Sequence, residues 1–545
     1  MVSKEVVKIP KGCFIYNSGY VYVNIESAYD PEAGYTRTRR LCIGKNIDGR
    51  TMFASDNYRK VCGGGEDLPE PGSKSDTVSA GMPLACARAA EVSGLMDTLR
   101  ETFGDEDARL IVDLATFAMT ERTDAFQHFP AYLFRNAQLS RPVPSDSTVG
   151  RFLKDRVTPT GTQKFLEGWK RRNTGKGTVY ICYDSTNVNC VAAGVTLSET
   201  GHAKDDPSKP QVNLEFVIRQ EDGLPLLYRE YPGSIVDVVE CSDMVGQLKS
   251  MGFTDIVVVC DRGYISEDNV RAFLGAGVGF LMLLRSGAVT DELVGKYGRR
   301  VRLRSDAYIP GRDLYGTTVR RRLFGDSGPV SSFHLVWSQE LAEGCRKGVM
   351  SDVASTEKVL GKMQRRGTPV TAQRLKELSR YFVVRLAPRT RKIASYARNA
   401  AIDDAVNNGG FMVLVSSAET TCAGAVEAYS RRDCVEKSFR ALKSDTGMCA
   451  LRGHSNTAVE GRFFVFFVAS ILRSVIFDRT RGLRAGNRKS FTFSAMVREL
   501  NKVEAVADYR TGRYSRRYRL TARQKSILEC LDLAEKDVDE FARNL

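Results

Sequence analysis

The sequence predicts a mixed α/β fold in which helices cover both faces of one sheet, and three observations predict it. A segment rich in β-branched and aromatic residues spans 178–187 and follows a turn-like stretch at 173–177. Five consecutive apolar residues at 256–260 are typical of a strand buried on both faces. A hairpin signal, Glu221-Asp222-Gly223, lies between these two segments.

The remaining segments follow in an order that fits one sheet. They are, in order, strand-like 216–220 and 224–231 around the hairpin signal, helix-like 242–251, a helix capped by Ser266 that runs to about Leu274, and strand-like 278–284. The chain therefore runs strand, hairpin of two strands, helix, strand, helix, strand. That is the ribonuclease-H-like order, a mixed sheet with helices on both faces.

Two aspartates follow the apolar part of two of these strands. Asp184 lies in the segment 178–187, and Asp261 directly follows the apolar run 256–260. A single Asp at a strand end is more often a turn or capping residue than a ligand. Two such residues favour a site, because open α/β sheets bind ligands at the carboxyl ends of their strands.

A third acidic residue lies in a basic setting near the last fifth of the chain. Tyr429, Arg432, Glu436 and Lys443 share one face about 60° wide if the segment is a single α-helix. The carboxylate suits a divalent cation, and the basic side chains suit phosphate oxygens. A solvated helix face with ion pairs is the alternative for such a run. The two upstream aspartates favour the functional interpretation.

Together these motifs resemble the insertion-sequence-four (IS-four) superfamily of DDE transposases. Its signature Y-x-x-R-x-x-x-E-x-x-x-x-x-x-K is matched without a gap by Tyr429, Arg432, Glu436 and Lys443. Further similar segments are 183–186 and 260–264 for the first and second acidic motifs, and 201–204 with 223–226 for the stretch between them. The resemblance covers about 178–477. One departure is that related enzymes often carry an Asn where residues 233–237 stand.

The resemblance implies a metal-dependent active site. Asp184, Asp261 and Glu436 would be catalytic and would hold two Mg²⁺ ions, for which Mn²⁺ would substitute. One ion would activate the attacking water or DNA 3′-hydroxyl, and the other would stabilise the leaving oxygen. The DNA contacts implied for the signature are Tyr429, Arg432 and Lys443.

The implied function is that of an insertion-sequence transposase, which cuts DNA at the ends of its element and transfers the strands into target DNA. Its partners would be double-stranded DNA, both terminal inverted repeats and target, and a second copy of the chain in a homodimeric synaptic complex. Two alternatives stay open: a structure-specific nuclease with the same core, and a DNA-binding repressor that no longer cleaves. The intact acidic positions disfavour the repressor.

Composition agrees with a DNA partner. The 545 residues carry a net charge of +15, which fits a polyanion. The thirteen cysteines form no C-x-x-C pair, and there are four histidines, which argues against a zinc finger and for reduced thiols. The N-terminus has no signal-peptide pattern, and the most apolar run, 463–472, is too short to span a membrane. We therefore expect a cytoplasmic, nucleoid-associated, prokaryotic protein without a membrane partner.

The chain length predicts several domains, with a ribonuclease-H-like core, a large β-rich insertion, and N-terminal and helical DNA-binding regions. The predicted divisions are 1–62, a small β-rich module; 63–80, a linker; 81–176, a helical DNA-binding domain; 177–284, the first part of the core; 285–407, the insertion; 408–455, the second part of the core; and 456–545, a helical region with a basic-aromatic segment. The early part of the insertion, which includes the basic run 299–304, alternates like β-structure, and 370–379 suggests a helix. After the insertion, 411–415 is strand-like and returns the chain to the core.

Other basic or aromatic residues are candidate DNA contacts. They are Arg320, Arg321 and Arg322 in the insertion, Arg452 and His454 after the signature, Arg516 and Arg517 in the tail, and Trp337 as a possible base-stacking residue. A helix start at 144–154 resembles a recognition helix, although a plain capped helix is as plausible. Strand-like 19–24 and 35–43 form a basic ribbon that suits either a major groove or a charged sheet edge.

Overall fold

The computed structural model describes residues 6–30, 34–62, 74–173, 178–190, 194–201, 206, 208–235, 244, 246, 255–448, 450–453, 455–486, 491–508 and 511–545. Contacts divide the chain into two compact units, Met1–Lys74 and Ser75–Leu545. The helix predicted at 242–251 lies, apart from residues 244 and 246, outside the described residues.

The first unit is a five-stranded antiparallel sheet in the order β1-β5-β4-β3-β2 with one helix. Its elements are β1 (Val6–Lys8), β2 (Phe14–Ile15), β3 (Tyr20–Asp30), β4 (Tyr35–Asn46), β5 (Thr51–Ala54) and α1 (Asp56–Cys62). The long β3–β4 hairpin confirms the two strands expected at 19–24 and 35–43. Val21, Ile43 and Met52 are fully buried and form a small core.

The second unit is built around a mixed sheet. Its central strands are β7 (Val179–Cys190), β8 (Gln211–Arg219), β9 (Pro225–Pro232), β10 (Ile256–Cys260) and β11 (Gly279–Leu283). They lie in the order β9-β8-β7-β10-β11; β8 is antiparallel to both neighbours, whereas β10 is parallel to β7 and to β11. This arrangement confirms the ribonuclease-H-like prediction. Ser266 caps α9 (Glu267–Gly275), also as predicted.

One strand from the predicted second part of the core and three strands from the predicted insertion extend this sheet beyond β11. The strand expected at 411–415 is β17 (Phe411–Ser416), which is antiparallel to β11. Outward from it lie β14 (Val330–Ser338), β13 (Leu314–Arg322) and β12 (Tyr308–Ile309), all antiparallel. β17 therefore covers the β11 edge, and the three insertion strands beyond it belong to the same sheet, as the β-structure expected in the early part of the insertion predicts.

The rest of the insertion contains more helix than the sequence predicts. Its elements are α10 (Ala288–Leu303), η3 (Ser305–Ala307), α11 (Gln339–Arg366), α12 (Ala372–Leu378), β15 (Phe382–Leu386), β16 (Ile393–Arg398) and α13 (Ala401–Asn407). The β-structure expected in the early part of the insertion is wrong for 288–303, because these residues form α10, which buries Leu293, Val294 and Val301 along one face. The helix expected at 370–379 is confirmed by α12.

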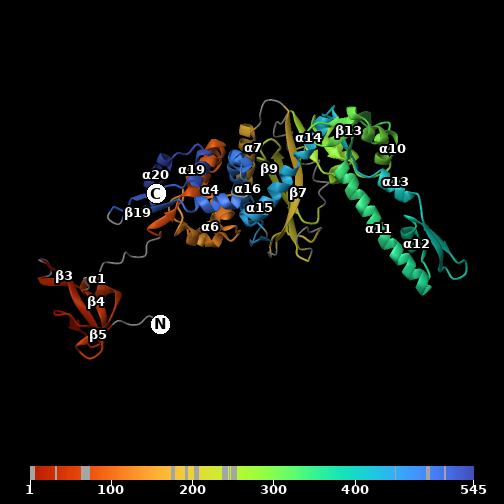
Figure 1. Ribbon diagram of the computed structural model, residues 1–545. Helices are drawn as coiled ribbons and strands as arrows, with labels where there is room; N and C mark the ends of the chain where they lie inside the picture. Colours follow the sequence, from red (N-terminus) through yellow and green to blue (C-terminus); the bar gives the residue numbers. More distant parts are fainter. Residues whose placement is uncertain are drawn as a thin grey trace. The chain divides into compact units, whose positions relative to one another are not determined.

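Helices from both ends of the second unit pack into one layer (Figure 1). They are α2 (Gly81–Val92), α3 (Leu95–Phe103), α4 (Asp105–Glu121), η1 (Phe126–His128), α5 (Phe129–Leu133), α6 (Asp146–Asp155), α7 (Pro159–Asn173), α16 (Asn456–Arg479), α17 (Arg481–Gly486), α18 (Phe493–Leu500), α19 (Ala522–Glu529) and α20 (Glu535–Arg543). The apolar run 463–472 is buried in α16, which contacts α2, α4 and β9. Within the described ranges, no helix has the length and apolarity that a membrane span requires.

A three-stranded sheet pairs a strand near the N-terminal end of this unit with two strands near its C-terminal end. β6 (Thr77–Ser79) pairs with β19 (Glu504–Ala507), which pairs with β20 (Tyr514–Arg516). β6 lies in the stretch predicted as a linker, and its pairing makes that linker shorter than expected. The helical regions at the two ends of this unit also share one hydrophobic core, although the sequence suggests two separate regions.

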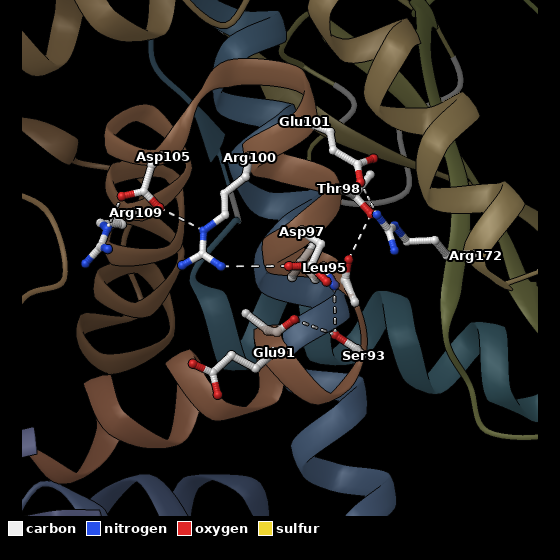
Figure 2. A network of polar contacts seen from close by, with 12 residues as sticks. Glu91, Ser93, Leu95, Asp97, Thr98, Arg100, Glu101, Asp105, Arg109 and Arg172 are labelled. Atoms are coloured by element: carbon white, nitrogen blue, oxygen red, sulfur yellow. Dashed lines mark hydrogen bonds and ion pairs between the residues drawn. The ribbon is translucent and has the colours of Figure 1, made fainter. Parts of the chain in front are cut away.

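A network of polar contacts fastens α3 to its neighbours (Figure 2). Arg100 on α3 donates to Asp105 at the start of α4 over 2.8 Å, and Asp105 also accepts from Arg109 over 2.8 Å. Arg172 near the end of α7 pairs with Glu101 on α3. These side chains are partly exposed, so each pair contributes little to stability and the network mainly fixes the α3–α4 corner.

Candidate active site

The first two acidic residues lie on adjacent parallel strands. Val259 of β10 lies opposite Cys182 of β7, so the same register carried two residues further puts Asp261 level with Asp184. Neighbouring strands are about 4.8 Å apart, which makes the two carboxylates neighbours at one level of the sheet. Asp261 follows the last residue of β10 and accepts a hydrogen bond from the Arg262 N–H over 2.7 Å. Asp184 lies within β7, which runs on to Cys190.

The signature segment forms two helices, not the single helix predicted. α14 (Cys422–Ser430) ends one residue after Tyr429, and α15 (Asp433–Thr446) carries Glu436 and Lys443. In the turn between them, the Arg432 N–H donates to the Tyr429 carbonyl and the Val435 N–H to the Arg432 carbonyl, both over 3.0 Å. Because these bonds span three residues instead of four, the backbone tightens there and the segment is not one regular α-helix.

Arg432 nevertheless lies among all three acidic residues. Its side chain is 14% exposed, and it donates to Glu436 Oε1 over 2.6 Å. Burial alone would lower the pKa of Arg432, but nearby acidic groups outweigh burial and raise it above its ordinary value. These groups are Tyr429, Asp261, Glu436 and Asp184. The Arg432 guanidinium therefore places a positive charge close to all three carboxylates.

Tyr429 links α14 to the sheet. Its hydroxyl donates to Asp261 Oδ1 over 3.4 Å, and the Arg432 guanidinium lies 5.6 Å from its ring centroid. Burial, more than any other cause, raises the pKa of Tyr429 to about 12, so the phenol stays protonated at neutral pH. The residue thus acts as a hydrogen-bond donor to the second acidic position.

A buried glutamine that the sequence did not single out supports this arrangement. Gln220 Nε2 donates to the Ala428 carbonyl over 2.6 Å and to Cys182 Sγ over 3.5 Å. It therefore joins the last turn of α14 to β7, two residues before Asp184 on the same strand face. A polar residue next to a hairpin signal gives no sequence cue to such a contact, because its partners lie far away in the chain.

The donor chemistry of the site fits a divalent cation. Three carboxylates from different elements provide the hard oxygen ligands that Mg²⁺ prefers. In the arrangement of the described residues, however, no three His, Cys, Asp or Glu side chains lie close enough to hold an ion. Glu436, 46% exposed, is bound to Arg432 instead. Asp184 and Asp261 are the carboxylates already side by side.

The other candidate DNA contacts lie in varied settings. Lys443 is half-buried on α15, and Arg452 is 63% exposed and 3.8 Å from Asp124. β13 holds Arg320 and Arg322 exposed on one face, whereas Arg321 on the other face pairs with Glu292. His454 lies outside the described residues.

Two further candidates are engaged inside the second unit. Arg516, 18% exposed, pairs with Glu535 and Asp539, and Arg517 pairs with Glu504. These pairs fasten the small sheet to its surroundings.

Trp337 is partly buried and packs against the main hydrophobic core. Its Nε1 donates to the Gly409 carbonyl over 3.2 Å, and its ring packs 5.8 Å from that of Tyr315. The stacking contact with an unpaired base stays a prediction.

The predicted recognition helix is α6. Ser145 caps it by accepting from the Thr148 N–H, and the helix buries Val149, Phe152 and Leu153. Its polar residues on the other side are exposed.

Comparisons with known proteins give one family match. The model of the family described as "Transposase DDE domain" matches residues 175–472. A solved structure titled "Cryo-EM structure of piggyBac transposase synaptic complex with hairpin DNA (SNHP)" is similar over 84% of this chain and 72% of that chain, with 9% identity and a TM-score of 0.31. No curated protein matches the chain.

Proposed function

The chain belongs to the family of transposase DDE domains, and on that premise we propose that it is the transposase of an insertion sequence in the IS-four superfamily. It is a DNA-cutting and strand-transferring enzyme, and enzymes of its family use divalent metal ions. The proposed reaction cuts DNA at the two ends of the element and joins the freed 3′ ends to target DNA.

One observation carries the assignment of the site: Arg432 interacts with all three acidic residues of the motif. We infer that Asp184 and Asp261 hold Mg²⁺, with Mn²⁺ as a substitute, and that Glu436 joins them when Arg432 releases it. Asp184, Asp261 and Glu436 would hold two such ions, which when bound would supply activation of the attacking oxygen and stabilisation of the leaving oxygen.

The chain's own cations and hydroxyl would position the DNA. Arg432 carries a planar guanidinium that can exchange a carboxylate for a phosphate with the same paired geometry. Lys443 on the same helix as Glu436 would hold a second phosphate. Tyr429 would keep Asp261 oriented through its hydroxyl, which the raised pKa keeps protonated.

The proposed partners are double-stranded DNA and a second copy of the chain. The DNA partner would include both the terminal inverted repeats of the element and the target DNA. The net charge of +15 favours binding to this polyanion. A reaction on two ends requires both to be held, which a homodimer in the synaptic complex would do. An insertion sequence places this reaction in the prokaryotic cytoplasm, where the DNA lies.

The decisive experiment replaces each acidic residue by its amide. Asp184→Asn, Asp261→Asn and Glu436→Gln should each abolish cleavage of a plasmid that carries the element with its flanking DNA, while binding of the end DNA persists. Each change removes a charged ligand and keeps the side-chain volume.

A matched control is available on α14. Glu427 is an exposed acid that pairs with Arg431, and Glu427→Gln should leave cleavage unchanged. Near-normal cleavage by any of the three amide variants would remove that residue from the proposed active site.

A further inference from the structure

The sheet of the first unit has a second face that points away from its core. Val21 is fully buried in the core, so the alternation of a strand puts Tyr20 and Tyr22 on the opposite face. Lys45 of β4 lies opposite Tyr20 in the register, and Arg40 lies further along β4 on that same face. These residues come from the long hairpin that the sequence identifies as a basic ribbon.

Aromatic rings from β2 and the turn after it complete this face. Phe14 lies opposite Tyr22, and the Tyr16 N–H donates to the Tyr20 carbonyl over 3.0 Å. The exposed fractions are 48% for Phe14, 41% for Tyr16 and 43% for Tyr20. The Tyr16 and Tyr22 rings are 4.9 Å apart and nearly perpendicular, which holds both in place. We call the set Phe14, Tyr16, Tyr20, Tyr22, Arg40 and Lys45 the aromatic face.

Two cations lie directly over these rings. The Arg40 guanidinium is 5.8 Å from the Phe14 centroid and 6.0 Å from that of Tyr16, whose hydroxyl accepts a hydrogen bond from it. The Lys45 ammonium is 5.9 Å from the Tyr20 centroid. Cations fixed between exposed rings provide phosphate contacts next to stacking surfaces.

Among the paired positions of the hairpin that the structure describes, the side with the aromatic face carries no acidic residue. In the register, the positions on this side of β3 are Tyr20, Tyr22, Asn24, Ser27 and Tyr29, and their partners on β4 are Lys45, Cys42, Arg40, Thr38 and Thr36. The charged residues at these positions are the cations Arg40 and Lys45, and an anionic partner with flat apolar groups complements them.

We propose that the aromatic face binds single-stranded DNA, with unpaired bases stacked on its rings and phosphates held by Arg40 and Lys45. Bases in a duplex are already stacked on each other, so exposed rings gain contact only with bases that have left the stack. A surface for duplex phosphates alone needs cations but no cluster of rings. The choice of DNA over RNA rests on the proposed function; the binding itself involves none of the acidic active-site residues.

The test measures binding to the full chain without cleavage. A fluorescein-labelled oligothymidylate of about 15 nucleotides is titrated in EDTA and followed by fluorescence anisotropy. Phe14→Ala and Tyr20→Ala should each weaken binding by about 5-fold to 100-fold. Tyr20→Phe keeps the ring and should bind within about twofold of the unsubstituted chain. Arg40→Ala should lower the slope of affinity against salt by about 0.7.

The opposite face of the same hairpin supplies matched controls. Tyr35 is 56% exposed, and Tyr35 and Arg39 alternate away from the aromatic face. Tyr35→Ala and Arg39→Ala should leave oligothymidylate binding unchanged. The assay contains no divalent metal and measures only binding. Its outcome therefore does not depend on whether the chain cleaves DNA, and failure of the binding proposal can be told apart from failure of the proposed function.

Three results would overturn the proposal: equal losses in the control variants, duplex DNA of the same length bound as tightly as the single strand, or an oligouridylate RNA bound more tightly than the DNA. Photo-crosslinking of the unsubstituted chain with iodouracil-containing single strands avoids any folding defect in the variants. Adducts should map to Phe14, Tyr16 or Tyr20, and adducts confined to other residues would also overturn it.

Discussion

Replacement of Arg432 by glutamine tests whether one guanidinium balances the acidic site. Arg432→Gln removes the positive charge and keeps a side chain that can still donate a hydrogen bond. Glu436 then loses the guanidinium that donates to it over 2.6 Å, and Asp184 and Asp261 lose one nearby positive charge. We expect a less stable protein whose stability has become more sensitive to Mg²⁺, because a bound cation would replace the missing charge.

The expected magnitude follows from burial. Removal of one partner from a fully buried ion pair costs about 3–5 kcal/mol, and from an exposed pair less than about 1 kcal/mol. Arg432 is 14% exposed but Glu436 is 46% exposed, which places the cost near 2 kcal/mol. Mg²⁺ at about ten times its Kd would restore ~1.4 kcal/mol in the variant. In the unsubstituted chain, the same ion must compete with the guanidinium, so its effect should be smaller.

The assay is thermal unfolding with and without Mg²⁺, and the adjacent residue is the control. Arg431 pairs with Glu427, and both side chains are 55% exposed. Arg431→Gln should therefore change the free energy of unfolding by less than about 0.5 kcal/mol. The reasoning is refuted if Arg432→Gln is no less stable than Arg431→Gln in EDTA, or if Mg²⁺ raises the Tm of both variants and of the unsubstituted chain equally.

Three further predictions follow from other contacts. Tyr429→Phe removes the hydroxyl that donates to Asp261, and it should slow plasmid cleavage about 2- to 10-fold while gel-shift binding of end DNA is unchanged. Burial raises the pKa of Glu230 to about 7 from 4.5, so the folded chain binds this proton more tightly and loses stability as pH rises through that interval. Glu230→Gln should therefore raise the Tm at pH 8, in a melting series over pH, and leave it nearly unchanged at pH 4. Replacing Arg320 and Arg322 together by alanine should lower the salt slope of end binding by about two, and an unchanged slope would mean that this face is only solvated.

The strands of the core could be predicted because their patterns are local. Runs of buried apolar residues identify β10 and β11, and the hairpin signal fixes the β8–β9 turn. The order of these elements then leaves few ways to build the sheet. The order of the strands also places Asp184 and Asp261 side by side in the register, because each follows the apolar part of one of two adjacent parallel strands.

The break between α14 and α15 could not be predicted in the same way. Neither Gly nor Pro marks it, and the apolar positions Val435, Phe439 and Leu442 continue a helical spacing. The tightening at Arg432 is instead accompanied by contacts to distant residues, such as the Gln220 bond to the Ala428 carbonyl. Periodicity describes one helix face and carries no information on such partners.

In the early part of the insertion, one segment shows both the alternation typical of a strand and the apolar spacing typical of a helix. Residues 299–304 alternate between arginine and other residues, which suggests a strand, yet Leu293, Val294 and Val301 recur at helical spacing. Packing of this apolar face against β14 favours the helix. Charged positions are weak guides in such a case, because an arginine on a solvated face fits either structure.

A site made of carboxylates has to remain folded before its cations arrive. Asp184 and Asp261 at one level of the sheet repel each other, and burial makes uncompensated charge costly. Arg432 offsets that repulsion from within the protein, and its ion pair with Glu436 keeps the third carboxylate on α15 close by. A guanidinium in this position is also a phosphate ligand, so arrival of metal and DNA gives both members of the pair new partners of the correct charge. In the proposed enzyme, the same contact would keep the carboxylates together before metal binds, and it would be exchanged for metal and phosphate contacts when metal and DNA bind.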